Sequence, residues 1–121
     1  MRMSGVLLFV KDLVEMTAFY RDLIGFRPVL ETSQDDWVEF DAGGAAFVLH
    51  AIPRHITDSV EIGVPPAARE SASCKLIFAV DDPEAERARL LAAGVTILQR
   101  SWGAWDAADP EGNVFGIRAS S

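Results

Sequence analysis

An internal repeat constrains the fold of this chain more than any other feature of its sequence. An apolar run that ends in a helix-starting aspartate occurs at residues 6–12 and again at residues 76–82, an offset of about 70 residues. Glycines match in the same order, Gly25 with Gly94 and the pair at 43–44 with Gly112 and its neighbour. Four matches in one order predict a duplicated structural unit.

The pattern inside the first copy predicts one strand, one helix and three further strands. Residues 5–10 form a short apolar run, which is typical of a strand buried on both faces. Asp12 and Glu15 make a capping box, and Gly25 is suited to end the helix. Between them, helical spacing relates the apolar residues Leu13, Met16, Tyr20, Leu23 and Ile24. The three predicted strands are 26–31, 36–41 and 45–50.

The second copy predicts the same order of elements. Residues 74–80 form the strand, Asp82 caps the helix, Pro83 begins it and Gly94 ends it. The last three strands are predicted at 95–99, 102–108 and 114–118, with a turn at 109–113. We therefore predict an α+β fold in a single domain, residues 1–121, with βαβββ modules at 5–50 and 74–118 and a linker at 51–73.

The composition of the chain argues against several classes of binding partner. The formal net charge of -7 argues against nucleic acid, because phosphate binding needs a basic surface. The chain holds no apolar run near the roughly 20 residues of a membrane span, and its start is too short for a signal-peptide core. The single cysteine, Cys74, excludes an internal disulfide and a Cys-rich zinc site, and we expect it to be a buried, inert thiol. A cytoplasmic protein is the expectation.

Two strings are specific when they occur together. They are Phe-Tyr-Arg-Asp-Leu-Ile-Gly-Phe at 19–26 and Asp-Pro-Glu-Gly-Asn at 109–113. With the two βαβββ units, they resemble the vicinal oxygen chelate superfamily, which includes glyoxalase I, bleomycin-resistance proteins and extradiol dioxygenases. The resemblance covers nearly the whole chain outside the linker. It implies curved sheets around a cleft and a homodimer, but it indicates the fold far more than the reaction.

Enzymes of this superfamily hold a divalent metal through His, Glu or Gln on the first and last strands of each unit. Carried over one position at a time, these ligand positions fall on Gly5, Lys75 and Gly116, and the fourth falls on Val48 or His50. Glycine has no side chain to bind a metal, and lysine presents a cation. One histidine cannot assemble a site of three or four ligands. The resemblance is therefore closest to the metal-free, bleomycin-resistance-like branch, and we expect no cofactor.

The tryptophans suggest a ligand site. Trp37 lies in an acidic stretch, and Trp102 and Trp105 flank a Gly-Ala pair just before Asp106. Aromatic rings beside carboxylates suit a flat cation through stacking and cation–π attraction. Packing in the core or at a dimer interface predicts the same tryptophans, and a solvated acidic face predicts the same charges. Because Trp102 and Trp105 are three residues apart, they point to opposite faces of a strand unless a bulge intervenes.

Two functions from different classes follow from these features. The first is metal-independent binding of a small aromatic molecule, with a cation favoured by the acidic surroundings. Its candidate ligand-binding residues are Trp37, Glu39, His50, Trp102 and Trp105. The alternative is a glyoxalase- or dioxygenase-type metalloenzyme with an atypical metal site, built from His50 and an acid such as Glu39 or Asp41. A metal-free enzyme with a general base is a third possibility, but no residue pattern singles it out.

Overall fold

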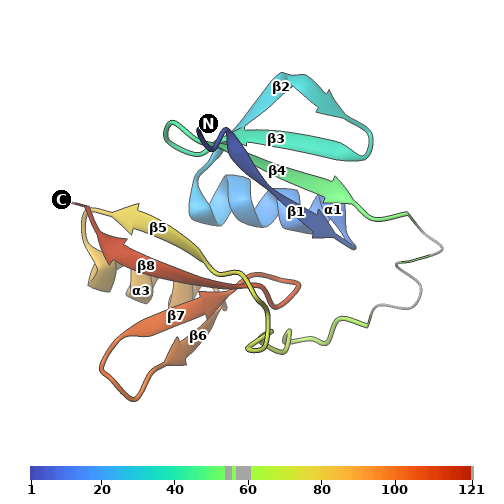
Figure 1. The fold of residues 1–121 in the computed structure, drawn as a ribbon. Coiled ribbons are helices and arrows are strands. Elements are labelled where there is room, and N and C mark those ends of the chain that lie inside the picture. Colours follow the sequence, from blue (N-terminus) through green and yellow to red (C-terminus); the bar gives the residue numbers. More distant parts are fainter. Residues whose placement is uncertain (54–55, 57–60, 121) are drawn as a thin grey trace. The chain divides into compact units, whose positions relative to one another are not determined.

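Each half of the repeat forms a four-stranded sheet with a helix on one face (Figure 1). The computed structural model describes residues 1–53, 56 and 61–120. These residues separate into two compact units, Met1–Glu61 (unit 1) and Ile62–Ser121 (unit 2). The α+β class and the two-module organisation are confirmed. That the whole chain forms one domain stays a prediction.

Unit 1 follows the predicted order of elements. They are β1 (Gly5–Val10), α1 (Leu13–Ala18), the π-helix η1 (Phe19–Ile24), β2 (Arg27–Gln34), β3 (Trp37–Asp41) and β4 (Ala46–Ala51). The strand order is β1-β4-β3-β2, with β1 parallel to β4 and the other pairs antiparallel. A parallel outer strand beside an antiparallel hairpin is what a strand–helix–three-strand chain produces when the helix crosses over the sheet.

The helix of unit 1 begins and ends where the sequence predicts, but its second half differs. The Asp12 carboxylate accepts a hydrogen bond from the Glu15 amide at 3.0 Å, and Gly25 takes the left-handed conformation at φ 89°. From Phe19 onward the chain winds as a π-helix, whose wider turn buries Phe19 and Tyr20 together. Phe19 is absent from the predicted apolar stripe, although its spacing of three residues from Met16 places it at the edge of that stripe in a regular helix.

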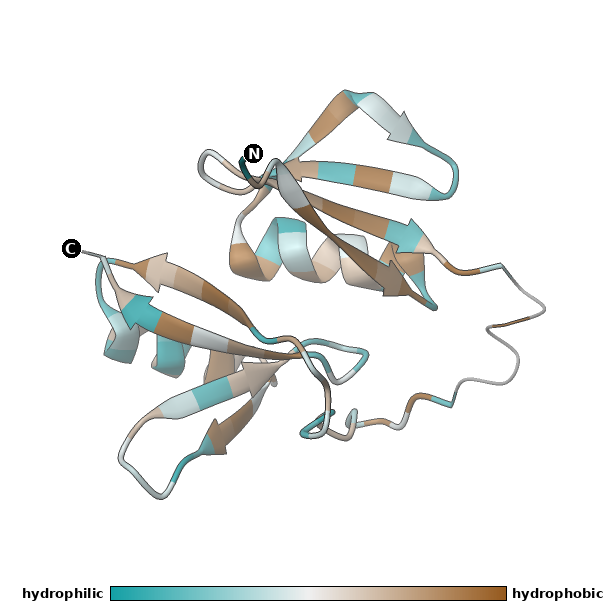
Figure 2. Cartoon of the chain, viewed as in Figure 1, coloured by the Kyte–Doolittle hydropathy of each residue, from teal (hydrophilic) through white to brown (hydrophobic). Residues whose placement is uncertain are grey.

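The core of unit 1 lies between the helix and one face of the sheet. Tyr20 packs against Phe47, with their ring centroids 4.7 Å apart. The other buried apolar side chains include Val10, Met16, Phe40 and Leu49. Each such side chain stabilises the fold by about 1.5–3 kcal/mol through the removal of apolar surface from water. Figure 2 shows hydrophobic residues along most of β1 and β4. Val10 of β1 and Phe47 and Leu49 of β4 are among those that lie in this core.

Unit 2 repeats the same arrangement. Its elements are β5 (Leu76–Val80), α3 (Pro83–Ala92), β6 (Thr96–Gln99), β7 (Trp105–Ala108) and β8 (Val114–Ala119), with strand order β5-β8-β7-β6. The Asp82 carboxylate caps α3 by accepting from the Ala85 amide at 3.1 Å. β5 begins at Leu76, two residues later than predicted. Cys74 therefore precedes the strand and is exposed, so the expectation of a buried thiol is wrong.

Part of the predicted linker has a fixed place in unit 2. The Arg69 amide donates to the Gly112 carbonyl at 2.8 Å, and Arg69 Nε donates to the Glu111 carbonyl at 3.0 Å. Gly112 has a φ of +85°, and a Cβ there would collide with the Ala67 carbonyl. The segment 67–72 is therefore fastened to the turn at 109–113. Residues 54–55 and 57–60 of the predicted linker lie outside the described residues.

Within the described part of the chain, no helix is both long enough and apolar enough to span a membrane.

Candidate functional site

The sheet of unit 1 carries a row of aromatic side chains on the face opposite α1, which we call the open face. Phe9 is paired with His50 across β1 and β4, and His50 is paired with Trp37 across β4 and β3. Residues paired in this way point to the same side of a sheet. The ring centroid of His50 lies 5.7 Å from that of Phe9 and 5.3 Å from that of Trp37. These three residues form the aromatic row, and Phe9 is 60% exposed.

Carboxylates flank the aromatic row. Asp36 Oδ2 lies 3.6 Å from His50 Nε2. Glu39 lies in the next row of the open face, where it is paired with Val48, and Val48 is paired with Leu7. Among the residues that the structure describes, Glu39 has no hydrogen-bonding or ion-pair partner.

Asp41 has a different role from Glu39, although both lie on β3. Its Oδ1 accepts from the Gly43 amide at 3.0 Å and the Gly44 amide at 3.4 Å, and its Oδ2 accepts from Arg27 at 3.1 Å. The two amides, with Arg27 adding to them, hold the pKa of Asp41 below its usual range. Asp41 is therefore committed to the hairpin turn, which leaves the alternative metal site without one of its proposed acids.

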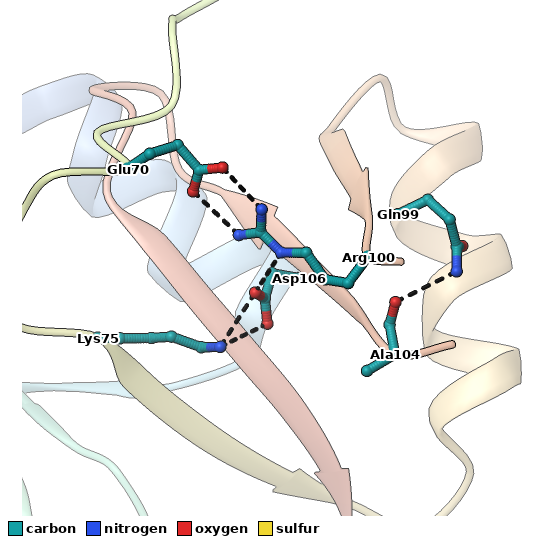
Figure 3. A network of polar contacts seen from close by, with 6 residues as sticks. All are labelled: Glu70, Lys75, Gln99, Arg100, Ala104 and Asp106. Carbon is teal, nitrogen blue, oxygen red and sulfur yellow. Dashed lines mark hydrogen bonds and ion pairs between the residues drawn. The ribbon is translucent and has the colours of Figure 1, made fainter. Parts of the chain in front are cut away.

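The corresponding face of unit 2 carries a network of four charged side chains (Figure 3). Lys75 Nζ lies 2.9 Å from Asp106 Oδ1 and 3.0 Å from Oδ2, and Arg100 Nε lies 2.8 Å from Oδ2. Arg100 also donates twice to Glu70, at 2.7 and 3.0 Å, which lowers the pKa of Glu70. The Asp106 side chain is only 6% exposed. Two cations and two anions thus neutralise one another.

Gly5, Lys75 and Gly116, three of the four residues at the superfamily's ligand positions, do not fit a metal. A Cβ at Gly5 would lie 2.6 Å from the Ala46 carbonyl oxygen, so the backbone leaves no room for a side chain. A Cβ at Gly116 would lie 3.1 Å from Lys75 Cε, and Lys75 itself is bound to Asp106. Val48 is a buried apolar side chain. Across the described ranges, no three or more His, Cys, Asp or Glu residues are grouped to hold a metal ion.

The structure brings together three of the five predicted ligand-binding residues. Trp37, Glu39 and His50 share the open face of unit 1. Trp102 lies in the turn between β6 and β7, is 72% exposed, and has the Arg100 guanidinium 6.0 Å from its ring centroid. Trp105 is buried on the α3 side of its sheet, because alternation along β7 gives Asp106 the other side.

Sequence reasoning missed Phe9. The unbroken apolar run of β1 predicted burial on both faces, whereas Leu7 and Phe9 are exposed on the open face. Period-2 alternation cannot separate an exposed apolar side from a buried one when both sides are apolar. The repeat contained a signal for this. Ala79 of the second copy stands where the first copy has Phe9, so the shared fold does not need an aromatic side chain at this position.

Comparisons with known proteins agree with this architecture. The family model of the glyoxalase-like domain matches residues 5–118. A crystal structure of a glyoxalase/bleomycin resistance protein/dioxygenase family enzyme from Burkholderia phytofirmans PsJN is 26% identical, with a TM-score of 0.68 and coverage of 96% of each chain. A search of curated proteins found no match.

Two further solved structures, both below 25% identity, show the fold alone. TnmS3, an antibiotic binding protein from Streptomyces sp. CB03234, is 23% identical, with a TM-score of 0.66 and coverage of 100% of this chain and 97% of that one. Lactoylglutathione lyase from Agrobacterium tumefaciens is 23% identical, with a TM-score of 0.65 and coverage of 98% and 93%. On the family match, with the two βαβββ units, the chain belongs to the glyoxalase-like domain family within the vicinal oxygen chelate superfamily.

Proposed function

We propose that this protein binds a small aromatic molecule, in particular a cationic one, on the open face of unit 1 and without a metal. The single observation that carries the proposal is the aromatic row of Phe9, His50 and Trp37 with Asp36 beside it and Glu39 in the next row. Aromatic side chains attract a flat cation through their ring faces, and nearby carboxylates favour its charge.

The exposure of the row supports binding over ordinary packing. Phe9 is 60% exposed and its neighbour Leu7 is 37% exposed, so these side chains add little to the core. A contiguous apolar and aromatic surface on a small protein marks a binding site more often than scattered exposed residues do. Removing this surface from water when a flat ligand settles on it supplies affinity that needs no metal.

The proposal includes sequestration of the ligand rather than its conversion. The misfit at Gly5, Lys75 and Gly116 removes the residues through which relatives hold a metal. One neighbour in fold, TnmS3, is described as an antibiotic binding protein, which is compatible with this proposal. The proposal also includes a homodimer, which the superfamily resemblance implies, and a location in the cytoplasm.

Quenching of tryptophan fluorescence tests the proposal. The protein is treated with EDTA and titrated with N-methylquinolinium and related flat cations. We expect saturable quenching that disappears in Trp37→Phe. Trp102→Phe is the matched control, because Trp102 lies in an exposed turn of unit 2, and this variant should keep the quenching.

Two results would overturn the proposal. One is the absence of saturable quenching by any of the cations, with circular dichroism showing a folded protein. The other is quenching that survives in Trp37→Phe and disappears in Trp102→Phe, which would place the ligand on unit 2.

A further inference from the structure

Each unit has one carboxylate at the same register position, on the face of its sheet that lies opposite its helix. In unit 1 a row across the sheet consists of Leu7, Val48 and Glu39. In unit 2 the equivalent row consists of Ile77, Gly116 and Asp106. The offset of the repeat on the first strand and the register on the last strand agree on this equivalence. Asp106 of unit 2 is therefore the structural equivalent of Glu39 of unit 1.

In unit 2 the carboxylate binds a primary ammonium. Lys75 Nζ lies within 3.0 Å of both oxygens of Asp106. The residue equivalent to Lys75 in unit 1 is Gly5, and the Ala46 carbonyl leaves no room for a side chain there. Glu39 consequently keeps the carboxylate but lacks the chain's own ammonium, and no described residue replaces it.

We propose that Glu39 recognises the protonated amine of the ligand, in the way that Asp106 holds Lys75. The inference rests on the proposed function and names its ligand class: a small arylalkylamine, with its ring on the aromatic row and its ammonium at Glu39. An ammonium with N–H groups forms charge-assisted hydrogen bonds with a carboxylate, whereas a quaternary cation lacks the donors to do so.

The register of β3 limits the length of such a ligand. Trp37 and Glu39 are two residues apart on the same face, which corresponds to about 7 Å along a strand. A ring on the aromatic row and an ammonium at Glu39 are therefore joined by a short alkyl chain. In unit 2 the Lys75 side chain passes over Gly116 of β8 to reach Asp106. Val48 of β4 stands at the equivalent position in unit 1, and its methyl groups fill that space. The ammonium reaches Glu39 from the solvent side.

The unequal chemistry of the two units supports the assignment to unit 1. The counterparts of Phe9 and His50 in unit 2 are Ala79 and Arg118, which offer no aromatic surface and add a cation. Asp106 is already bound by two cations. Among the described residues at these register positions, a ring surface and a carboxylate without an ion-pair partner occur together in unit 1 and not in unit 2.

Three matched probes test the inference by equilibrium dialysis, with the free probe read from naphthalene absorbance. They are 1-naphthylmethylamine, which is cationic at neutral pH, the neutral 1-naphthylmethanol and the anionic 1-naphthoate. We expect the amine to bind at least about tenfold more tightly than the alcohol, from one charge-assisted hydrogen-bonded pair, and the carboxylate to bind most weakly. In Glu39→Gln, the ratio of amine to alcohol affinity should fall close to one.

Glu31→Gln is the matched control, because it removes one negative charge from an exposed position on β2 of the same unit. It should leave the ratio of amine to alcohol affinity within about twofold of the original, since exposed charges are screened at physiological salt. A Glu39→Gln protein that still prefers the amine tenfold would overturn the role of Glu39 and leave the proposed function standing. If none of the three probes binds, the proposed function and the inference both fail.

Discussion

Gly5 is the residue whose surroundings bear most directly on metal binding. The sequence shows only that glycine stands at a ligand position, whereas the structure shows that the Ala46 carbonyl excludes any side chain there. Lys75 and Gly116 occupy two further ligand positions in unit 2. There the lysine fills the space above the glycine and forms an ion pair with Asp106. The packing at these three positions therefore does not suit the ligands through which enzymes of the superfamily hold a metal.

Gly5→Ala should destabilise the protein. Its Cβ would lie 2.6 Å from the Ala46 carbonyl oxygen, which is backbone and moves only if β1 and β4 separate locally. We expect a loss of about 1–3 kcal/mol in the free energy of unfolding, measured with urea. Ser4→Ala, one residue earlier and exposed, should change it by less than about 0.5 kcal/mol. A Gly5→Ala protein as stable as the wild type would show that the position tolerates a side chain.

Asp106→Asn should also destabilise the protein. The substitution removes the negative charge that lies between Lys75 and Arg100 and leaves two cations facing a neutral amide. Because Asp106 is 6% exposed while both cations keep access to water, we expect a loss of about 2–3 kcal/mol. Asp81→Asn, at an exposed position, serves as the control. Equal unfolding curves for the wild type and Asp106→Asn would contradict the account of the network.

At the scale of elements, features that depend on neighbouring residues in the sequence were predictable, and features that depend on tertiary contacts were not. Asp12, Asp82, Gly25 and Gly94 fix where the helices start and end through hydrogen bonds of near neighbours, and all four positions were predicted. The π-helix was not predicted, because the apolar spacing of residues 19–24 also fits a regular helix; in the structure Phe19 and Tyr20 are both buried within it.

Two other features escaped prediction because they depend on tertiary contacts. The exposure of Phe9 depends on what covers the sheet and not on the residues beside it in the sequence. The fastening of residues 67–72 to the turn at 109–113 depends on Gly112, which lies about 40 residues further along the chain.

The segment 67–72 gives unit 2 a sensitivity to acid. Arg100 lowers the pKa of Glu70 in the folded state. A carboxyl whose pKa is lower in the folded state than in the unfolded state stabilises the fold above its unfolded pKa, and this stability is lost as the pH falls through the folded value. Glu70→Gln should therefore make Tm depend less steeply on pH below about 5. Tm measured between neutral and acid pH checks this.

Glu61→Gln removes an exposed carboxyl and is the control for this measurement. It should keep the acid limb of the wild-type curve. Identical limbs for the wild type and Glu70→Gln would indicate that the Glu70–Arg100 pair does not link the segment to stability.

At the scale of the whole molecule, the repeat predicted the architecture. Comparison of its two copies also identified the residues of the candidate site. Both modules and the α+β class followed from four matches in the sequence. The candidate site followed only in part. Trp37, Glu39 and His50 share a face of unit 1, whereas Trp102 and Trp105 belong to unit 2, where one lies in an exposed turn and the other is buried. The differences between the copies, Gly5 against Lys75 and Phe9 against Ala79, are the basis for proposing binding on unit 1 and not on unit 2, where Lys75 already pairs with Asp106.

The indole N–H resonances of metal-stripped, 15N-labelled protein test most directly whether a ligand binds at the aromatic row without a metal. Trp37→Phe identifies the resonance of Trp37, and the wild type is then titrated with 1-naphthylmethylamine in the presence of EDTA. The account predicts a saturable shift of the Trp37 resonance, with those of Trp102 and Trp105 unmoved. A Trp37 resonance that does not move, or moves only after a divalent metal is added, would contradict metal-independent binding at the aromatic row.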